Sequence, residues 1–241
     1  MEMVQGLWIC EAEDRLSNLE RLCINSFLNN GHDFHLYSYQ ELTNLPIGVV
    51  SHDANEILPE DQIWRTDNGS LAGFADTFRY KLLYEKGGWW VDLDAFCYKP
   101  FDFKDALVFS SEEGREEYEG MRLVNGGVMK VPPKHPSMKK ALETSEKFGN
   151  GSEFGSTGPE LLTALIPSME LGPFVKGPEV FCPVPWDKFT SLVENPCPRF
   201  TKRTFSVHFW NEMWRERGLD KNGKYHRRSF YEAMKRKHLS S

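Results

Sequence analysis

Two aspartates follow a run of apolar side chains near the middle of the chain. Asp92 and Asp94 close the stretch Trp89-Trp90-Val91, whose aromatic and branched residues are typical of a β-strand. Side chains alternate along a strand, so Trp90, Asp92 and Asp94 would share one face. Burying two carboxylates without a cation is costly, and Mg²⁺ and Mn²⁺ prefer oxygen ligands. The sequence therefore predicts a metal site at Asp92 and Asp94.

The segment before this strand has the pattern of an amphipathic helix. Apolar side chains recur at helical spacing and mark a buried face, at Phe74, Phe78 and Leu82. Asp76 and Arg79 lie three residues apart and therefore share a different face. They are either a surface ion pair, which would be worth little, or part of the site. Gly87-Gly88 should end the helix, because glycine tolerates the left-handed conformation of a helix cap.

The beginning of the chain alternates strands and helices. We expect strands at residues 6–10, 33–39 and from 49 onward, with a helix over residues 19–27. This order is typical of a parallel sheet with crossover helices, so the expected fold class is α/β. Ligands on such sheets bind at the carboxyl ends of the strands. Trp8 and the two aspartates fall at expected strand ends and could line one cleft.

The second half of the chain is less regular. We expect a short strand at 106–110, a solvated acidic loop or helix at 112–119, and a strand at 122–131 that two glycines break. A helix over 136–148 should follow. Thr157 and Glu160 have the spacing of a capping box, which predicts that Thr157 caps another helix. Residues 172–198 are rich in proline and look irregular, and residues 205–210 indicate a late strand.

The composition is that of a soluble globular protein, with 40% hydrophobic and 27% charged residues. We expect one domain from a chain of 241 residues. The formal charge of −6 argues against nucleic-acid binding. No apolar run approaches the roughly 20 residues that span a bilayer. Five cysteines without a C-x-x-C pair indicate reduced, buried thiols.

The two ends of the chain bear on its location. The N-terminus carries acids where a signal peptide carries bases, so we expect a cytoplasmic protein that is not secreted. The tail from Arg215 to His238 is rich in Lys and Arg, unlike the acidic remainder. It is either a solvated terminal helix or a surface that attracts anionic lipid or an anionic acceptor. The second alternative predicts peripheral membrane contact through this tail.

The combined motifs resemble a known family. The DXD-containing sugar transferases of glycosyltransferase family 32 include mannosyltransferases and α-1,4-galactosyltransferases, and the clostridial glucosylating toxins have a related catalytic domain. These proteins share with this chain the spacing Asp76-x-x-Arg79 followed by Gly87-Gly88-x-Trp90-x-Asp92-x-Asp94. Further similar segments follow in the same order: Gly6-Leu7-Trp8-Ile9, Asn125-Gly126-Gly127-Val128, Thr157-Gly158-Pro159, residues 178–186 and His208-x-Trp210-x-x-x-Trp214. The resemblance covers nearly the whole chain.

This resemblance implies a GT-A fold, which is a Rossmann-like mixed sheet flanked by helices, in a single domain over residues 1–241. A nucleotide-sugar half would comprise residues 1–110 and an acceptor half residues 111–241, with the basic tail at 215–241. Such an enzyme would move a sugar from a nucleotide-diphosphate sugar to a glycan or other hydroxyl acceptor, with retention and with Mn²⁺ or Mg²⁺. A UDP-sugar is the favoured donor and a GDP-sugar the alternative. Our hypothesis is a bacterial or viral enzyme of surface glycan biosynthesis.

The resemblance also implies a metal-ligand set. Asp94 would bind the metal directly, Asp92 would bind the metal or the donor ribose, and His208 would be a third ligand. The plain alternative for His208 is a core histidine with satisfied hydrogen bonds. The chain departs from the family at Trp90, where tyrosine is more common. An indole cannot accept a hydrogen bond as a phenol can, so no hydroxyl role falls to Trp90.

Donor contacts are implied as well. Asp76 and Arg79 would hold hydroxyls of the donor sugar, and Asn125 would contact the same sugar. Trp8 would stack on the base, and Trp210 would reach the diphosphate. For Trp8 the alternative is an ordinary core position.

Two other functions compete with sugar transfer. An apolar strand that ends in D-x-D also opens the aspartyl-phosphate phosphatases, in which Asp92 would be the nucleophile and magnesium would be bound. That motif usually has Thr or Val two residues after the second aspartate, where this chain has Phe96. The phosphatase motif also normally lies near the N-terminus, whereas here it begins at Asp92. A carbohydrate-binding protein without catalysis is the third possibility.

Overall fold

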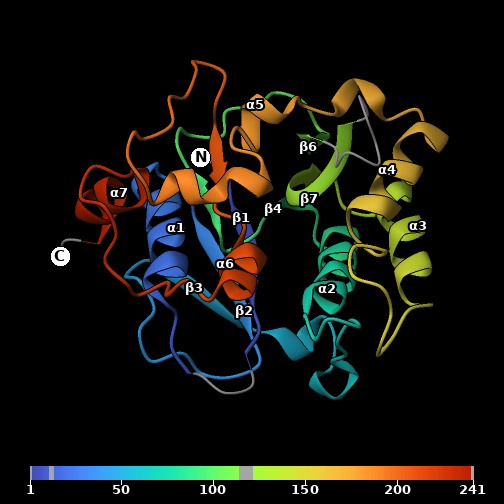
Figure 1. Ribbon diagram of the computed structural model, residues 1–241. Coiled ribbons are helices and arrows are strands. Elements are labelled where there is room, and N and C mark those ends of the chain that lie inside the picture. Colours follow the sequence, from blue (N-terminus) through green and yellow to red (C-terminus); the bar gives the residue numbers. More distant parts are fainter. Residues whose placement is uncertain (1, 11–13, 114–121, 240–241) are drawn as a thin grey trace.

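A mixed six-stranded sheet forms the centre of the molecule (Figure 1). The computed structural model describes residues 2–10, 14–113 and 122–239. The strands lie in the order β3-β2-β1-β4-β7-β6; the first four are parallel, and β7 runs antiparallel to both neighbours. Their bounds are β1 Val4–Trp8, β2 Phe34–Ser38, β3 Val49–Asp53, β4 Gly88–Val91, β6 Val108–Glu113 and β7 Arg122–Val131. This mixed α/β sheet with flanking helices confirms the expected fold class.

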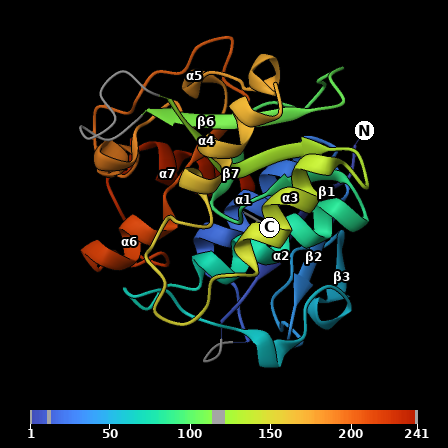
Figure 2. The ribbon, with the colours of Figure 1, turned by 90° about the vertical axis from the view of Figure 1, so that its right-hand side faces the viewer.

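Helices cover both faces of this sheet. One apolar cluster packs α1 and α7 against one face, and a second packs α2, α3 and α4 against the other. Figure 1 shows these two groups on opposite sides of the strands, and Figure 2 shows α2 and α3 in front of the sheet. The helices are α1 Asn18–Asn29, α2 Ala72–Glu85, α3 Pro136–Ser145, α4 Pro159–Ser168, α5 Pro178–Phe181, α6 Asn211–Arg217 and α7 Phe230–His238. Short 3₁₀ turns lie at Ala54–Glu56, Glu60–Gln62, Gly172–Phe174 and Trp186–Leu192.

The predicted helix and its glycine stop are confirmed. α2 ends before Gly87, which has a φ of 66° and takes the left-handed conformation that a side chain disfavours. The alternation expected for the following strand also holds, since Trp89 and Val91 enter one apolar cluster and Trp90 enters the other. This strand is shorter than predicted, because β4 ends at Val91.

A second, two-stranded sheet joins the aspartates to the C-terminal region. β5 spans Ala95–Cys97 and pairs antiparallel with β8, Ser206–His208. In this register Ala95 lies opposite His208. The pairing therefore places His208 beside Ala95, the residue that follows Asp94.

Several other expectations differ in detail. The strand at 122–131 is one element, but its pairing with β6 is interrupted at the two glycines: Phe109 lies opposite Met129 and Ser110 lies opposite Asn125, so residues 126–128 form a bulge in β7. The helix expected over 136–148 ends at Ser145. The basic tail forms two helices, α6 and α7, and α7 buries Phe230 and Tyr231 in the core instead of being fully solvated.

Two expectations about the chain as a whole concern cysteines and membranes. All five cysteines are free, and three of them are buried, while Cys10 and Cys197 are half-buried. Within the described residues, no helix combines the length and the apolar character that crossing a membrane requires.

Candidate functional site

The candidate site lies where the connections of the central sheet change direction. β1 leads through α1 to β2 on one side, while β4 pairs with β1 on the other side. In open α/β sheets, ligands bind outside the carboxyl ends of the strands at such a point. Trp8 ends β1, and Asp92 follows the last residue of β4. Because β1 and β4 are parallel neighbours, these residues lie at the same edge of the sheet, and that they line one cleft stays a prediction.

A tight turn, and not the strand itself, holds the two aspartates. The N–H of Asp92 donates to the carbonyl of Gly127 over 2.8 Å, and the N–H of Ala95 donates to the carbonyl of Asp92 over 2.9 Å. The indole N–H of Trp90 donates to Asp92 Oδ1 over 2.7 Å. Trp90 thus orients the carboxylate of Asp92, a role that its sequence position did not reveal.

Asp92, Asp94 and His208 converge. One ligand atom from each lies within 4.8 Å of the others. Asp94 Oδ1 lies 3.0 Å from His208 Nε2, and Asp94 Oδ2 accepts the N–H of Asn211 over 2.7 Å. On the other side of the imidazole, the thiol of Cys182 lies 3.9 Å from Nδ1. The structure therefore brings together the three residues that the sequence proposed as metal ligands.

Asp94 and His208 form a buried ion pair. Burial raises the pKa of Asp94, but the charge and hydrogen bond of His208 outweigh it, and the N–H of Asn211 adds to the effect, so the net pKa is lowered. Burial lowers the pKa of His208, but the charge and hydrogen bond of Asp94 raise it well above its ordinary value. A carboxylate beside a protonated imidazole is therefore the resting form of this pair without a metal.

This donor set fits a divalent cation. Two carboxylates and one imidazole are ligands that Mn²⁺ and Mg²⁺ accept, although oxygen dominates for both. The 3.0 Å between Asp94 Oδ1 and His208 Nε2 matches the separation of adjacent ligands around an octahedral ion with bonds of about 2.1 Å. The oxygen Asp92 Oδ2 also lies near this place, since a side chain on Gly127 would come within 3.2 Å of it and within 3.1 Å of the His208 ring.

Arg79 of α2 lies between two carboxylates. Its guanidinium is 2.9 Å from Asp76 Oδ1 and 3.4 Å from Asp92 Oδ1, and it packs over the Trp90 ring at 5.2 Å from the centroid. Burial lowers the pKa of Arg79, but Asp92 and Asp76 raise it beyond its usual value. Its Nε has no hydrogen-bond partner among the described residues. The predicted Asp76–Arg79 pair is therefore buried and joined to the aspartate turn.

Asp76 also contacts Thr157, whose predicted role is corrected here. Thr157 does not cap α4: Gly158 occupies the N-cap position, and no side chain in the described part of the chain caps this helix. Instead, the Thr157 hydroxyl donates to Asp76 Oδ2 over 2.9 Å. Burial raises the pKa of Asp76 to about 6, because Arg79 and Thr157 offset the loss of solvation only in part.

Asn125 is held by its neighbours. Its Oδ1 accepts the N–H of Gly127 over 2.7 Å, and its Nδ2 donates to Glu112. Glu112 is a second correction: it belongs to β6 and is buried, whereas the sequence placed it in a solvated acidic segment. The remainder of that segment, at 114–119, lies outside the described residues. No pattern in the sequence separated Glu112 from the acids that follow it.

The two tryptophans proposed for the donor are both buried. Trp8 borders a small hollow with Ile9, Tyr39 and Ile63, and its indole N–H has no partner among the described residues. The indole N–H of Trp210 donates to the carbonyl of Val184 over 2.8 Å. Trp210 lies against the His208 ring, with centroids 4.2 Å apart. It therefore supports the imidazole, and its N–H is already engaged.

Comparison with known proteins gives two successive family matches. Residues 17–112 match the glycosyltransferase sugar-binding region containing the DXD motif. Residues 130–238 match the alpha 1,4-glycosyltransferase conserved region. The first match contains Asp76, Arg79, Asp92 and Asp94, and the second contains Thr157 and His208.

Individual relatives agree with these matches. Lactosylceramide 4-alpha-galactosyltransferase of Mus musculus is 27% identical over 157 residues, which cover 59% of this chain and 42% of that protein. The Homo sapiens protein of the same name is 26% identical over the same coverage. The chain thus spans less than half the length of these curated relatives.

Among solved structures, similarity is weaker. The PaToxG glycosyltransferase has a TM-score of 0.47 at 15% identity, covering 70% of this chain and 68% of its own. An active-site mutant of LgtC has a TM-score of 0.45 at 13% identity, covering 86% of this chain and 87% of its own. The two successive family matches, which leave only short segments of the chain unmatched, are the stronger finding. Both halves of this chain thus match glycosyltransferase families, the first of them the family that contains the DXD motif.

Proposed function

We propose that this chain is a metal-dependent glycosyltransferase that moves a sugar from a nucleotide-diphosphate sugar to a hydroxyl acceptor. The observation that carries the proposal is the convergence of Asp92, Asp94 and His208 beside a buried cluster of Asp76 and Arg79. One group of side chains has the donor atoms for a cation, and the other offers charged hydrogen-bonding groups suited to a sugar. The glycosyltransferase family matches support the same conclusion.

Asp92, Asp94 and His208 would hold Mn²⁺ or Mg²⁺. When bound, the cation would stabilise the negative charge that develops on the departing nucleoside diphosphate. The turn after β4 and the β5–β8 pairing fix the three ligands before any ion arrives, which limits the cost of ordering them. His208 must lose its Nε2 proton to become a ligand.

Two buried donors are suited to the nucleotide sugar. Arg79 Nε and the indole N–H of Trp8 lack partners among the described residues, and a buried donor without a partner is costly. Hydroxyl and phosphate oxygens of a donor substrate would satisfy them. In this proposal Asp76 and Arg79 hold sugar hydroxyls, Asn125 contacts the same sugar, and Trp8 lies beside the base.

The finer assignments belong to the same proposal. A UDP-sugar is the favoured donor, a glycan the favoured acceptor, and transfer proceeds with retention. The relatives named as lactosylceramide 4-alpha-galactosyltransferases support an α-linked galactose as the sugar moved. Residues 1–110 would form the donor half and residues 111–241 the acceptor half of one domain. Trp210 would serve the diphosphate through its ring or its backbone, since its indole N–H is engaged.

The test is hydrolysis of nucleotide sugars by the purified full chain, with and without Mn²⁺. Release of free sugar that requires the metal supports the proposal, and Asp94→Asn should lose this release while remaining folded. Asp33→Asn is the matched control, since Asp33 is exposed and immediately precedes β2, at the opposite edge of the sheet from the site. Phosphate release from a simple phosphomonoester, without sugar release, would instead indicate a phosphatase. Tight binding of a nucleotide sugar without turnover would indicate a binding protein.

A further inference from the structure

An exposed aromatic and cationic surface lies at the end of β5 that is remote from the metal-ligand candidates. Tyr98 directly follows β5, and 40% of its surface is exposed. Its ring contacts Phe200 edge-on, with centroids 5.4 Å apart. Phe200 in turn contacts Phe230, the first residue of α7, at 4.9 Å. These contacts bring together three segments that are far apart in the sequence.

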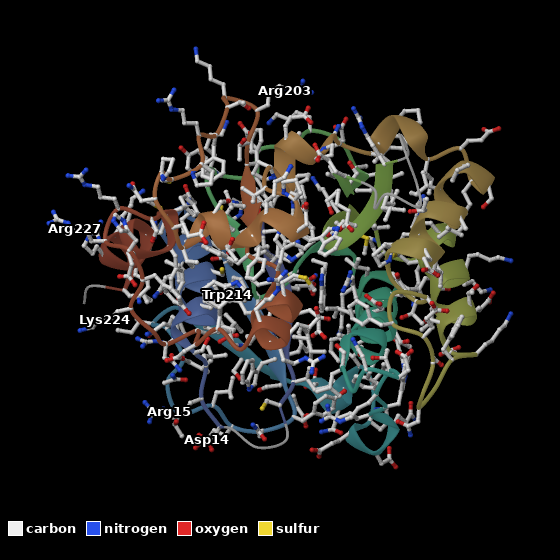
Figure 3. The ribbon with its side chains drawn as sticks, in the orientation of Figure 1. Asp14, Arg15, Arg203, Trp214, Lys224 and Arg227 are labelled. Atoms are coloured by element: carbon white, nitrogen blue, oxygen red, sulfur yellow. The ribbon has the colours of Figure 1, made fainter. Side chains whose placement is uncertain are left out.

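Cationic side chains flank these rings. Four of them are exposed on the joined segments: Arg199, Lys202, Arg227 and Arg228. We call these four residues, with Tyr98 and Phe200, the Tyr98 patch. Neither residues 195–204 nor residues 221–229 contain an acid. Arg203 is left out of the patch because it pairs with Glu179 at 2.7 Å. In Figure 3, Arg227 projects outward beside α7, on the side of the molecule away from α2 and α4.

We propose that the Tyr98 patch docks this protein on an anionic membrane surface. Basic side chains near a bilayer are drawn to anionic head groups, and tyrosine is enriched at the level of those head groups. The four cations of the patch contribute +4 to the formal net charge of −6, so the other residues together carry −10. An anionic surface therefore attracts this face and repels the rest, which fixes the orientation of the docked protein.

A flat membrane explains the patch better than an extended polyanion. A bilayer contacts one face and leaves the acidic remainder in water. A nucleic acid that runs on past the patch meets that acidic remainder. The exposed ring of Tyr98 also adds apolar area that a head-group region accommodates but a phosphate backbone does not use.

The patch and the candidate site are joined by one short strand. Asp94 directly precedes β5 and Tyr98 directly follows it, so at about 3.4 Å per residue the two residues lie roughly 14 Å apart. A docked protein would therefore hold the site close to the lipid surface, where a membrane-borne acceptor could reach it. This consequence rests on the proposed function, whereas the docking itself does not.

Co-sedimentation of the full chain with vesicles tests the proposal. Phosphatidylcholine vesicles are compared with vesicles that also contain phosphatidylglycerol, at low and at physiological salt. We expect binding only to the anionic vesicles, weakened by salt. Arg227→Glu with Arg228→Glu should weaken it at least about tenfold, and Tyr98→Ser about threefold. The control is Lys139→Glu with Lys140→Glu on α3, which makes the same charge change at exposed positions outside the patch. The binding of this control variant to anionic vesicles should stay within about twofold of that of the unaltered protein.

The outcomes separate docking from catalysis. Donor hydrolysis should be unchanged in the patch variants, and Asp94→Asn should sediment normally although it lacks hydrolysis. Equal losses in the patch and control variants would show that only net charge matters and would overturn the proposal. Absence of any dependence on phosphatidylglycerol would also overturn it, as would binding to double-stranded RNA without binding to vesicles.

Discussion

The hydroxyl of Thr157 donates a hydrogen bond to Asp76 Oδ2 over 2.9 Å and so ties the segment before α4 to the middle of α2. A side chain on Gly158 would come within 2.8 Å of the same oxygen, so the backbone after Thr157 also lies against Asp76. Asp76 thereby has two polar partners, Thr157 and Arg79, which hold its carboxylate on the side of the aspartate turn.

Removing the Thr157 hydroxyl should therefore weaken the site more than the fold. Thr157→Val keeps the volume but leaves Asp76 without one hydrogen bond, which costs about 1–2 kcal/mol. We expect kcat/KM for nucleotide-sugar hydrolysis to fall roughly tenfold. Thr157→Ser retains the donor and should remain close to the unaltered enzyme. The prediction is wrong if Val and Ser variants of equal melting temperature have the same kcat/KM.

Local patterns in the sequence predicted the parts of the site that lie within one element. The spacing of Asp76 and Arg79 on one helix, the stop at Gly87 and the alternation of Trp89 and Trp90 follow from the 3.6-residue and two-residue periods of helices and strands. Asp92 and Asp94 were found for a chemical reason, since two acids separated by one residue after an apolar run need compensation of their charge.

Contacts between elements were not predictable in the same way. Thr157 had the local signature of a helix cap, but the tertiary partner Asp76 lies 81 residues away and takes its hydroxyl. Glu112 resembled the acids after it, and only its pairing with β7 buries it beside Asn125. No sequence period specifies which distant strand will pair with which, so these assignments require the tertiary structure.

Gly126 should be required for full turnover because Arg79 occupies the space next to it. A side chain at position 126 would lie 1.7 Å from Arg79 Nη1. In Gly126→Ala the guanidinium must move, and it would leave Asp76 and Asp92. We expect turnover of nucleotide sugars to fall at least about tenfold. The melting temperature should fall by only a few degrees, because the clash involves the end of one side chain.

Gly149 supplies the matched control for this substitution. A side chain at position 149 would meet no atom of the described residues within 4 Å, and the φ of Gly149 lies outside the left-handed range. Gly149→Ala should therefore leave turnover and melting temperature nearly unchanged. If Gly126→Ala has the activity of Gly149→Ala, then the position of Arg79 does not matter for turnover, and its assignment to the donor sugar fails.

Asp76 should impose a pH dependence on the stability of the fold. Its pKa is about 6 in the folded protein against an ordinary value of 3.8, because burial outweighs Arg79 and Thr157. A carboxyl with a raised folded-state pKa is more easily ionised in the unfolded chain. The contribution of Asp76 to the free energy of unfolding is therefore fully present below pH 3.8 and is lost as the pH rises to about 6. Above that value its ionisation should cost roughly 3 kcal/mol, since two pKa units correspond to nearly that free energy.

Asp76→Asn isolates this contribution from the other carboxyl groups, several of which titrate in the opposite sense. Glu2 and Asp94, for example, have lowered pKa values and gain stability as the pH rises. We therefore compare melting temperatures of the Asn variant and the unaltered protein between pH 4 and pH 7, the interval about the folded-state pKa of 6. The melting temperature of the variant should increase relative to that of the unaltered protein as the pH rises, and the difference should become constant above about pH 6. A difference that is constant over this interval, or that shrinks, would show that Asp76 is not the carboxyl with the raised pKa.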